Sequence, residues 1–296
     1  MIHLVKYSGG AGSYMCGKRV ADREGTKDLH LLFTDTLTED EDLYRFAIEG
    51  AFNIFGLYDR DLLDMASNVP RLEDNEEDRR KYLLDLSILT MKIIPNFIWL
   101  IDGRNIWEIF FKERYIGSSR RDPCSKKLKR EIADRYIYKK YKPDEVIIYL
   151  GIDWTEDHRY IKARDKFLPY ICKAPMTEDP LMDKAEVFEF IQKQGIRLPR
   201  LYDLGFSHNN CGGFCIKAGL GHFKNLLEKM PDRYAYHEKK EQEFYDFIQR
   251  DASVGFLRKS IQGERVYISM KQLREMTLSE DEARDVGGCG CYVDNI

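Results

Sequence analysis

Residues 2–13 read IHLVKYSGGAGS and combine a short apolar run with a glycine-rich turn. Residues 2–7 alternate apolar and polar side chains and are rich in β-forming residues, which predicts a strand. Residues 14–22 contain no proline and a single glycine, which predicts a helix. A strand that turns through glycines into a helix N-terminus presents backbone N–H groups and the positive end of the helix dipole. The pattern therefore predicts a phosphate-binding loop, to which Ser8 and Ser13 can add hydroxyl groups; a glycine-rich turn without a ligand is the alternative.

A second apolar run occupies residues 28–36, soon after the predicted helix, and ends in polar side chains. Strand, helix and strand at this spacing form a βαβ unit, which predicts a parallel sheet. Ligands of such sheets bind at the carboxyl ends of the strands. Asp35 lies at such an end, where its carboxylate could meet a ribose hydroxyl. The alternative is that Asp35 caps the helix that begins near Glu39.

The rest of the chain divides near residue 175, because Pro175 and Pro180 interrupt the pattern of strands and helices. We expect an α/β domain over residues 1–175, with a helical insertion around 37–95, and an α-rich domain over residues 176–296. Further strands of the first domain are expected at residues 96–101 and 145–150. The predicted fold class is therefore α/β, with a parallel, doubly wound sheet and a cysteine-bearing, α-rich C-terminal domain.

The composition is that of a folded protein without a membrane-spanning segment. The chain has 296 residues, of which 43% are hydrophobic and 33% are charged, enough for a substantial core and a solvated surface. No apolar run reaches transmembrane length, and the N-terminus lacks the basic-then-apolar pattern of a signal peptide. We therefore expect a cytoplasmic protein with no membrane partner. In that compartment the seven cysteines favour metal or redox chemistry over a disulfide framework.

Residues 112–142 carry the strongest local charge, although the formal charge of the whole chain is only −3. The segment holds 12 Lys and Arg against 4 Asp and Glu, and 12 minus 4 is an excess of +8. A solvated helix face explains much of this charge. A contact with phosphate or nucleic acid explains its concentration in one segment, so nucleic acid is a candidate partner.

Ser-Gly-Gly-x-x-Ser directly after the first strand resembles the pyrophosphatase loop of the adenine nucleotide α-hydrolase (PP-loop) superfamily. Residues 33–36, Phe-Thr-Asp-Thr, are similar to a strand end that is typical of its phosphoadenosine phosphosulfate reductase-like family. The resemblance implies a Rossmann-like sheet that binds ATP or a related adenine nucleotide, with or without magnesium. The nucleotide-binding residues that it implies here are Ser8, Gly9, Gly10, Gly12, Ser13, Asp35 and Thr36. Gly12 stands where the ATP-cleaving members carry Asp.

Two later segments extend the resemblance in the order of the family. Residues Cys124 to Lys129 are similar to a Cys-x-x-x-Leu-Lys segment whose basic residues approach a sulfonucleotide or an iron–sulfur cluster, so Lys129 is a candidate catalytic residue. Gly151, Glu156 and Arg159 match a Gly-x-x-x-x-Glu-x-x-Arg arrangement that closes on the nucleotide's phosphates. Arginine suits this role because its guanidinium group bonds phosphate bidentately. A surface pair between Glu156 and Arg159 on one helix is the alternative.

Four cysteines form two glycine-flanked pairs, Cys211 with Cys215 and Cys289 with Cys291. Four sulfurs suffice for tetrahedral zinc or for an iron–sulfur cluster, so all four are candidate metal ligands. Four buried structural cysteines are the alternative, although the flanking Gly and Asn residues are poor core formers. The tail pair could instead supply the nucleophilic thiolate of a sulfonucleotide reductase, so Cys289 and Cys291 are also candidate catalytic residues.

These motifs lead to three functional hypotheses. In the first, the protein acts at the ATP α-phosphate to activate a substrate, for sulfur transfer to a nucleotide or nucleic acid, and Arg159 neutralises the developing charge. In the second, it reduces a sulfonucleotide through Cys289 or Cys291, with a thiol donor protein as partner. In the third, it is a nucleotide-binding or sensing subunit without turnover, which Gly12 in place of Asp favours. A homo-oligomer is compatible with all three.

Overall fold

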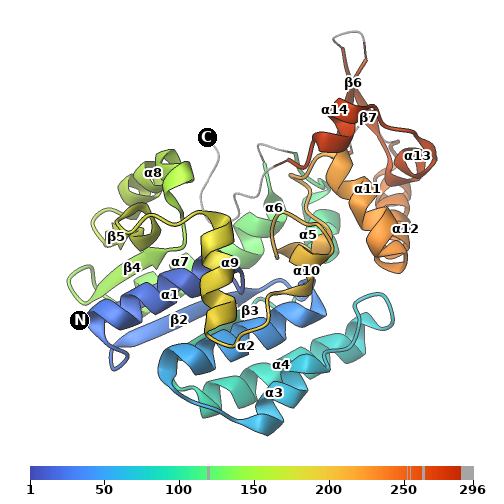
Figure 1. Cartoon of the computed structure of the whole chain (residues 1–296). Helices are drawn as coiled ribbons and strands as arrows, with labels where there is room; N and C mark the ends of the chain where they lie inside the picture. Colours follow the sequence, from blue (N-terminus) through green and yellow to red (C-terminus); the bar gives the residue numbers. More distant parts are fainter. Residues whose placement is uncertain (119–120, 252, 254, 262–263, 288–296) are drawn as a thin grey trace.

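The computed structural model describes residues 1–118, 121–251, 253, 255–261 and 264–287. Five strands form a parallel sheet in the order β3-β2-β1-β4-β5 (Figure 1). The strands are β1 (Ile2–Lys6), β2 (Leu29–Asp35), β3 (Phe97–Ile101), β4 (Val146–Leu150) and β5 (Ile171–Lys173). The expected α/β class with a parallel, doubly wound sheet is confirmed.

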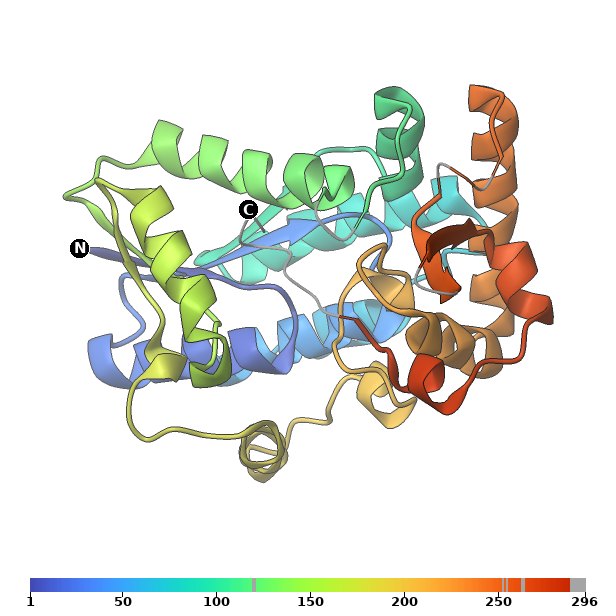
Figure 2. The same cartoon turned by 90° about the horizontal axis from the view of Figure 1, so that it is seen from above.

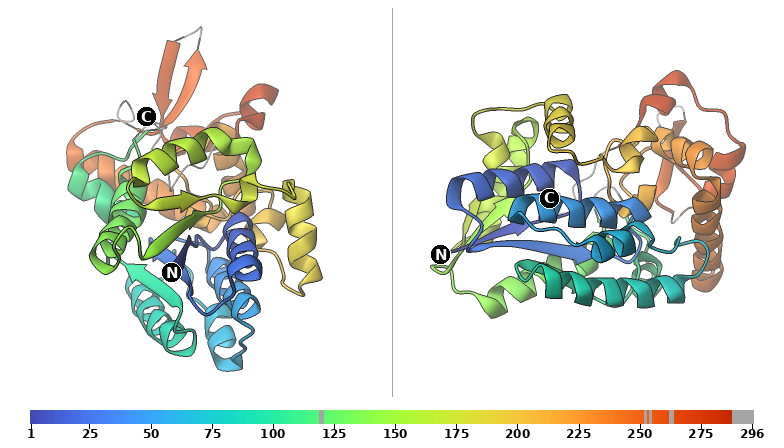
Figure 3. Two further views of the ribbon diagram at one scale, coloured as in Figure 1. Left: turned by 90° about the vertical axis from the view of Figure 1, so that its left-hand side faces the viewer. Right: turned by 60° about the horizontal axis from the view of Figure 1, so that its bottom comes forward.

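Helices connect the strands and cover both faces of the sheet, as Figures 2 and 3 show from further directions. The helices between β1 and β4 are α1 (Ala11–Glu24), α2 (Glu41–Phe55), α3 (Arg60–Ser67), α4 (Glu76–Ile93), α5 (Ile106–Glu113), α6 (Pro123–Ser125), the π-helical turn η1 (Lys126–Arg130) and α7 (Glu131–Lys140). The elements after β4 are η2 (Trp154–Glu156), α8 (Asp157–Phe167), η3 (Pro175–Thr177), α9 (Lys184–Lys193), α10 (Arg200–Asp203), η4 (Cys211–Gly213), α11 (Leu220–Lys229), α12 (Pro231–Ile248), β6 (Leu257–Ile261), β7 (Glu264–Ile268), α13 (Met270–Glu275) and α14 (Glu280–Arg284). None of the helices in the described part of the chain combines the length and apolar character needed to cross a membrane.

Successive side chains along β1 and β2 point to opposite faces of the sheet, and each face has its own core. Val5 and Leu31 face a core that α1, α2, α3, α4 and α9 cover. Leu4 and Leu32, one residue away in each strand, face a second core beneath α7 and α8. This period of two is what a strand buried on both faces requires.

A third core holds the C-terminal part together and includes helix α5 from the first half of the chain. Trp107 of α5 packs against Phe214, and Phe214 in turn packs against Phe223 of α11. Helix α9, in contrast, contributes Val187 and Ile191 to the first core beside α1. A helix from before residue 175 thus packs in the C-terminal core, and a helix from after it packs in the first core. The domain boundary near residue 175 stays a prediction.

The register of the sheet brings two strand ends together. Lys6 pairs with Leu150, so β1 and β4 end side by side, and the residues that follow them meet at one edge. Strand β2 runs further, because Lys6 is level with Leu32 and β2 continues to Asp35. The glycine-rich loop therefore lies between the end of β4 and the longer β2.

A run of acidic side chains follows β2, and Glu39, Asp40 and Glu41 in it are buried. Buried carboxylates are retained only when cations or hydrogen bonds compensate for the lost water. Their cationic partners come from distant segments: Lys129 Nζ lies 2.8 Å from Glu39, Arg200 Nη2 lies 2.8 Å from Asp40, and Arg79 Nη1 lies 3.0 Å from Glu41. The acidic run thus ties together parts of the chain that are far apart in sequence.

Glu41 is the most connected member of this run, because Arg79, Arg200 and Arg233 all contact its carboxylate. Burial alone would raise the pKa of Glu41, but the guanidinium groups, that of Arg233 foremost, hold the pKa below its ordinary value. A carboxylate whose pKa is lower in the folded chain stabilises the fold above its unfolded pKa of about 4.3. That contribution is lost as the pH falls through the folded pKa.

Replacing Glu41 with Gln should lower the free energy of unfolding by about 3 kcal/mol at pH 7, because three guanidinium groups lose their shared carboxylate. The variant should also lose less stability than the wild type when the pH falls below about 4.5, since the titrating group is gone. Urea denaturation followed by circular dichroism measures both effects. Asp64→Asn is the control, because the pair of Arg60 with Asp64 is 81% and 66% exposed and should contribute less than about 1 kcal/mol. Equal losses in the two variants would contradict the role of Glu41.

Candidate functional site

The loop after β1 has the geometry of an anion cradle. Gly9 has a φ of +75°, and a Cβ there would lie 2.7 Å from Leu43 Cδ2, so this position requires glycine. Helix α1 begins at Ala11, directly after Gly10, and neither a capping side chain nor an acidic residue occupies its first turn. The first N–H groups of a helix have no intrahelical partner, so those of α1 are available to a ligand. The hydroxyl of Ser13 donates to the carbonyl of Gly10 at 2.8 Å and thereby braces the turn.

The end of β4 packs against this cradle through its backbone. A Cβ on Gly151 would lie 2.9 Å from both the carbonyl oxygen of Gly12 and the Cα of Ser13, so only glycine permits the approach. The chain then enters η2 and α8, which bring Glu156 and Arg159 to the same edge of the sheet. Arg159 contacts Glu156, and its Nε is buried without a hydrogen-bond partner among the described residues.

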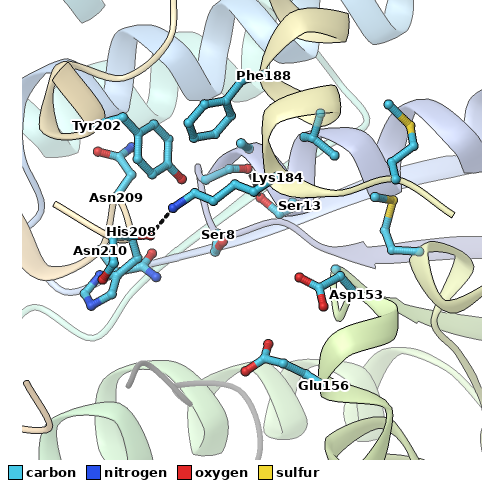
Figure 4. A pocket seen from close by; sticks show the side chains of 18 of the residues that line it. Ser8, Ser13, Asp153, Glu156, Lys184, Phe188, Tyr202, His208, Asn209 and Asn210 are labelled. Atoms are coloured by element: carbon cyan, nitrogen blue, oxygen red, sulfur yellow. Dashed lines mark hydrogen bonds between the residues drawn. The ribbon is translucent and has the colours of Figure 1, made fainter. Parts of the chain in front are cut away.

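A cavity of about 260 Å³ lies between these elements (Figure 4). Its lining includes Ser8, Gly10, Gly12, Ser13, Gly151, Glu156 and Arg159, which are seven of the residues that the sequence predicts for the nucleotide site. Gly9 belongs to the same loop, where a Cβ would collide with the side chain of Leu43. Asp153 also lines the cavity, and its carboxylate accepts a hydrogen bond from the Thr155 N–H at 2.9 Å. The cavity therefore opens at the carboxyl edge of the sheet, where α/β proteins bind ligands.

The opposite wall of the cavity comes from the C-terminal half of the chain. Lys184 and Phe188 of α9 and Tyr202 of α10 lie over the glycine loop, followed by His208 and Asn209 (Figure 4). The rings of Phe188 and Tyr202 lie 4.6 Å apart, and Lys184 Nζ lies 5.4 and 5.0 Å from their centroids. Asn209 Nδ2 donates to the carbonyl of Gly9 at 3.0 Å. We call residues 182–210 the cap. The sequence did not predict that the cap lines this site, because no local pattern shows that it folds back over the loop.

Asp35 and Thr36 lie away from the lining of this cavity. The carboxylate of Asp35 is fully buried and accepts hydrogen bonds from the Leu37 N–H at 2.7 Å and the Tyr44 hydroxyl at 2.9 Å. Burial raises the pKa of Asp35 to about 6. The alternative role for Asp35 was to cap the N-terminus of the helix that follows. Asp40 has that role instead, because its carboxylate accepts a hydrogen bond from the Asp42 N–H at the start of α2. Asp35 therefore orders the turn after β2.

A second, small cavity of about 20 Å³ lies beneath the C-terminal part. It is lined by Thr36, Lys129, Cys124, Cys211 and Cys215, among other residues. Lys129 is only 2% exposed and pairs with Glu39, so the structure brings this candidate catalytic residue to the small cavity and not to the larger one. The described residues contain no group of three or more His, Cys, Asp or Glu side chains arranged to hold a metal ion. Cys289 and Cys291 lie outside the described residues, so a metal site made with them stays a prediction.

Among the described residues, the basic stretch 112–142 contributes no side chain to the larger cavity, and Lys129 is its one cation in the lining of the small cavity. Arg130 is buried and pairs with Asp122 at 2.8 Å, and Lys127 pairs with Glu131 at 3.0 Å. Lys139 and Lys140 end α7, and the chain then starts β4 at Val146, at the opposite edge of the sheet from the glycine loop. A nucleic-acid contact through this stretch stays a prediction.

Gly10→Ala offers a test of the cradle that leaves the fold intact. A Cβ on Gly10 would meet only Ser8 Oγ and Tyr202 Oη, each at 3.7 Å, and the φ of −104° suits any residue. The added methyl group would crowd a phosphate at the first N–H groups of α1 and lengthen its hydrogen bonds. Affinity for ATP or pyrophosphate should therefore fall about tenfold or more, since a hydrogen bond to a charged group contributes about 1.5–3 kcal/mol. Calorimetric titration measures the affinity, and thermal unfolding should show an unchanged melting temperature. Gly151→Ala, whose Cβ meets backbone atoms, should lower both; wild-type affinity in Gly10→Ala would contradict the cradle.

Comparison with models of known protein families, with curated proteins and with solved structures finds no match to this chain. The parallel sheet of order 3-2-1-4-5 is compatible with a Rossmann-like, nucleotide-binding enzyme. Function must therefore be argued from the residues of the larger cavity.

Proposed function

We propose that this protein binds ATP or a closely related adenine nucleotide and acts at its α-phosphate. The observation that carries the proposal is the arrangement of the larger cavity, in which the uncapped N-terminus of α1 faces Arg159 across the carboxyl edge of the sheet. A helix N-terminus and an arginine both favour phosphate. The motifs that resemble the PP-loop superfamily support the choice of an adenine nucleotide.

The residues around the cavity suit separate roles in this reaction. The N–H groups at the start of α1 would hold the outer phosphates, and Arg159 would neutralise the charge that develops as pyrophosphate leaves. Asp153 and Glu156 present carboxylates to the cavity (Figure 4). Carboxylates and phosphate oxygens are the ligands that magnesium prefers, so these two residues would hold the ion that accompanies ATP and offsets its charge.

The proposed chemistry is adenylation followed by sulfur transfer. An oxygen of the acceptor attacks the α-phosphorus, the bond from phosphorus to the bridging oxygen breaks, and pyrophosphate leaves. The outer sulfur of a donor persulfide then attacks the adenylated carbon of the acceptor and displaces AMP. A second thiolate of the donor attacks the inner sulfur of the resulting disulfide, so that the S–S bond breaks, the outer sulfur stays on the acceptor and the donor is left as a disulfide. The acceptor is a nucleotide or a nucleic acid in this proposal.

A second candidate is a nucleotide-binding subunit without turnover. Gly12 leaves the first turn of α1 without a carboxylate, and Arg159 is already in contact with Glu156. The feature that favours this candidate is Gly12, which stands where the ATP-cleaving members of the superfamily carry Asp. Reduction of a sulfonucleotide is a third candidate, and its nucleophiles, Cys289 and Cys291, lie outside the described residues.

Product analysis of the purified protein under anaerobic conditions separates these candidates. The protein is incubated in parallel with magnesium and ATP, and with phosphoadenosine phosphosulfate and a thiol donor. AMP with pyrophosphate from ATP is the expected result. Sulfite from the second incubation would replace the proposal with the reductase, and tight binding without either product would favour the subunit without turnover.

Arg159→Ala should weaken ATP binding about tenfold to hundredfold, because a charge-assisted bond to phosphate contributes about 1.5–3 kcal/mol. Arg164→Ala is the matched control, since Arg164 lies on the same helix, is 53% exposed and pairs with Asp165. Calorimetric titration with ATP compares the two variants. Equal affinities in Arg159→Ala and Arg164→Ala would refute a phosphate contact by Arg159.

The cysteine site is proposed separately, with zinc or an iron–sulfur cluster held by Cys211, Cys215, Cys289 and Cys291. The first two line the same small cavity, which supports their shared role. Elemental and labile-sulfide analysis should find the metal in the wild type and in Cys16→Ala, because Cys16 lies on α1 and is buried in the first core, but not in Cys211→Ser. A wild-type protein without zinc or iron would contradict this site.

A further inference from the structure

Lys184 stands out in the cap, because it brings a second cation to the larger cavity. It is the first residue of α9 and extends across the cavity between the aromatic pair and the glycine loop (Figure 4). Its Nζ donates to the carbonyl of Ser207. No carboxylate pairs with Lys184 among the described residues, in contrast to Arg159, which contacts Glu156. Its positive charge is therefore uncompensated on the wall that faces the cradle.

The acidic groups nearest to Lys184 along the chain are already engaged. Asp183 accepts a hydrogen bond from the Glu186 N–H at 2.8 Å, and the Glu186 carboxylate accepts from the Asp183 N–H at 2.7 Å. This capping box fixes the start of α9. Each of the two carboxylates accepts a hydrogen bond from the backbone N–H of the other residue, so both stabilise the start of α9.

The position of Lys184 is set by rigid neighbours. Val187 and Ile191, on the same helix, pack into the core beside α1. The rings of Phe188 and Tyr202 support the aliphatic stem and the ammonium group at 5.4 and 5.0 Å. The side chain of Lys184 is still exposed to solvent, and the burial of part of it lowers its pKa.

The cap also contacts the glycine-rich loop directly. Asn209 is only 1% exposed, and its Nδ2 bond to Gly9 fixes the cap to the loop at one point. Tyr202 also reaches the loop, because its hydroxyl would lie 3.7 Å from a Cβ placed on Gly10. Lys184 therefore lines the same cavity as the N-terminus of α1.

We infer that Lys184 is a phosphate-binding residue that contacts the outer phosphates of the bound nucleotide from the cap. The inference rests on the proposed function, because the anion in the cradle is the phosphate chain of that nucleotide. Phosphates would then lie between α1, Arg159 and Lys184, so that the C-terminal half of the chain completes the site. The ligand class is a nucleoside triphosphate or pyrophosphate, because a chain of phosphates can contact α1, Arg159 and Lys184 at the same time.

Calorimetric titrations of Lys184→Gln with ATP, AMP and inorganic pyrophosphate test this inference. Affinity for ATP and for pyrophosphate should fall about tenfold or more, and affinity for AMP should change less than about twofold. Lys184→Arg should retain most of the affinity for ATP, because it keeps the charge. Lys193→Gln is the matched control on α9, since Lys193 is 68% exposed and pairs with Glu189.

The outcomes separate this inference from the proposed function. If wild-type protein binds ATP but Lys184→Gln binds it equally well, or loses ATP and AMP to the same extent, Lys184 does not contact the outer phosphates. A merely structural role would lower the melting temperature without changing the ratio of ATP to AMP affinity. If wild-type protein binds pyrophosphate through Lys184 but discriminates against adenine nucleotides, the proposed function fails while the phosphate contact stands. Wild-type protein that binds none of the three ligands would overturn both.

Discussion

The structure depends on the neutralisation of the acidic run that follows β2. Glu39, Asp40 and Glu41 are buried, and a buried carboxylate without a partner would cost several kcal/mol. The chain can bury them only by bringing Lys129, Arg79, Arg200 and Arg233 to the same place. Two of these cations precede β4 and two lie in the C-terminal half. The ionic cluster therefore determines how the two halves of the chain meet.

The same cluster positions the cap over the cavity. Arg200 is held by Asp40, and the N–H of Cys211 donates to the carboxylate of Glu39. The segment between these two anchors is the one that carries Tyr202 and Asn209 to the glycine loop. Cys211 itself takes a left-handed conformation with a φ of +57°, an arrangement that costs energy for a residue other than glycine and persists only where its surroundings enforce it. Neutralising the acidic run thus also builds one wall of the candidate nucleotide site.

Local signals in the sequence predicted the parts of the structure that local chemistry determines. The strand, the glycine turn and the helix of residues 2–22 depend on neighbours in sequence, and the structure shows them as β1, the loop and α1. Asp35 could not be placed in this way, because its burial depends on Tyr44 and on Trp99, which is 64 residues away. The Cys-x-x-x-Leu-Lys pattern made Lys129 a candidate catalytic residue, and only the fold shows that it pairs with the buried Glu39. The cap was missed for the same reason, since its contact with the loop joins Gly9 to Asn209 across 200 residues.

The absence of a side chain at Gly12 affects the charge of the site more than its packing. A Cβ at this position would lie 3.4 Å from the carbonyl oxygen of Gly151, so a side chain would fit, whereas Gly151 itself cannot carry one. Sterics therefore require glycine at 151 but not at 12. The consequence of Gly12 is electrostatic: the first turn of α1 has no acidic residue, and the positive end of its dipole faces the cavity without local compensation. The carboxylates of the cavity lining come instead from Asp153 and Glu156, which follow the end of β4. An anion held between α1, Arg159 and Lys184 would contact positive groups from the loop, from α8 and from the cap. Asp153 and Glu156 would contact it only through a shared magnesium ion.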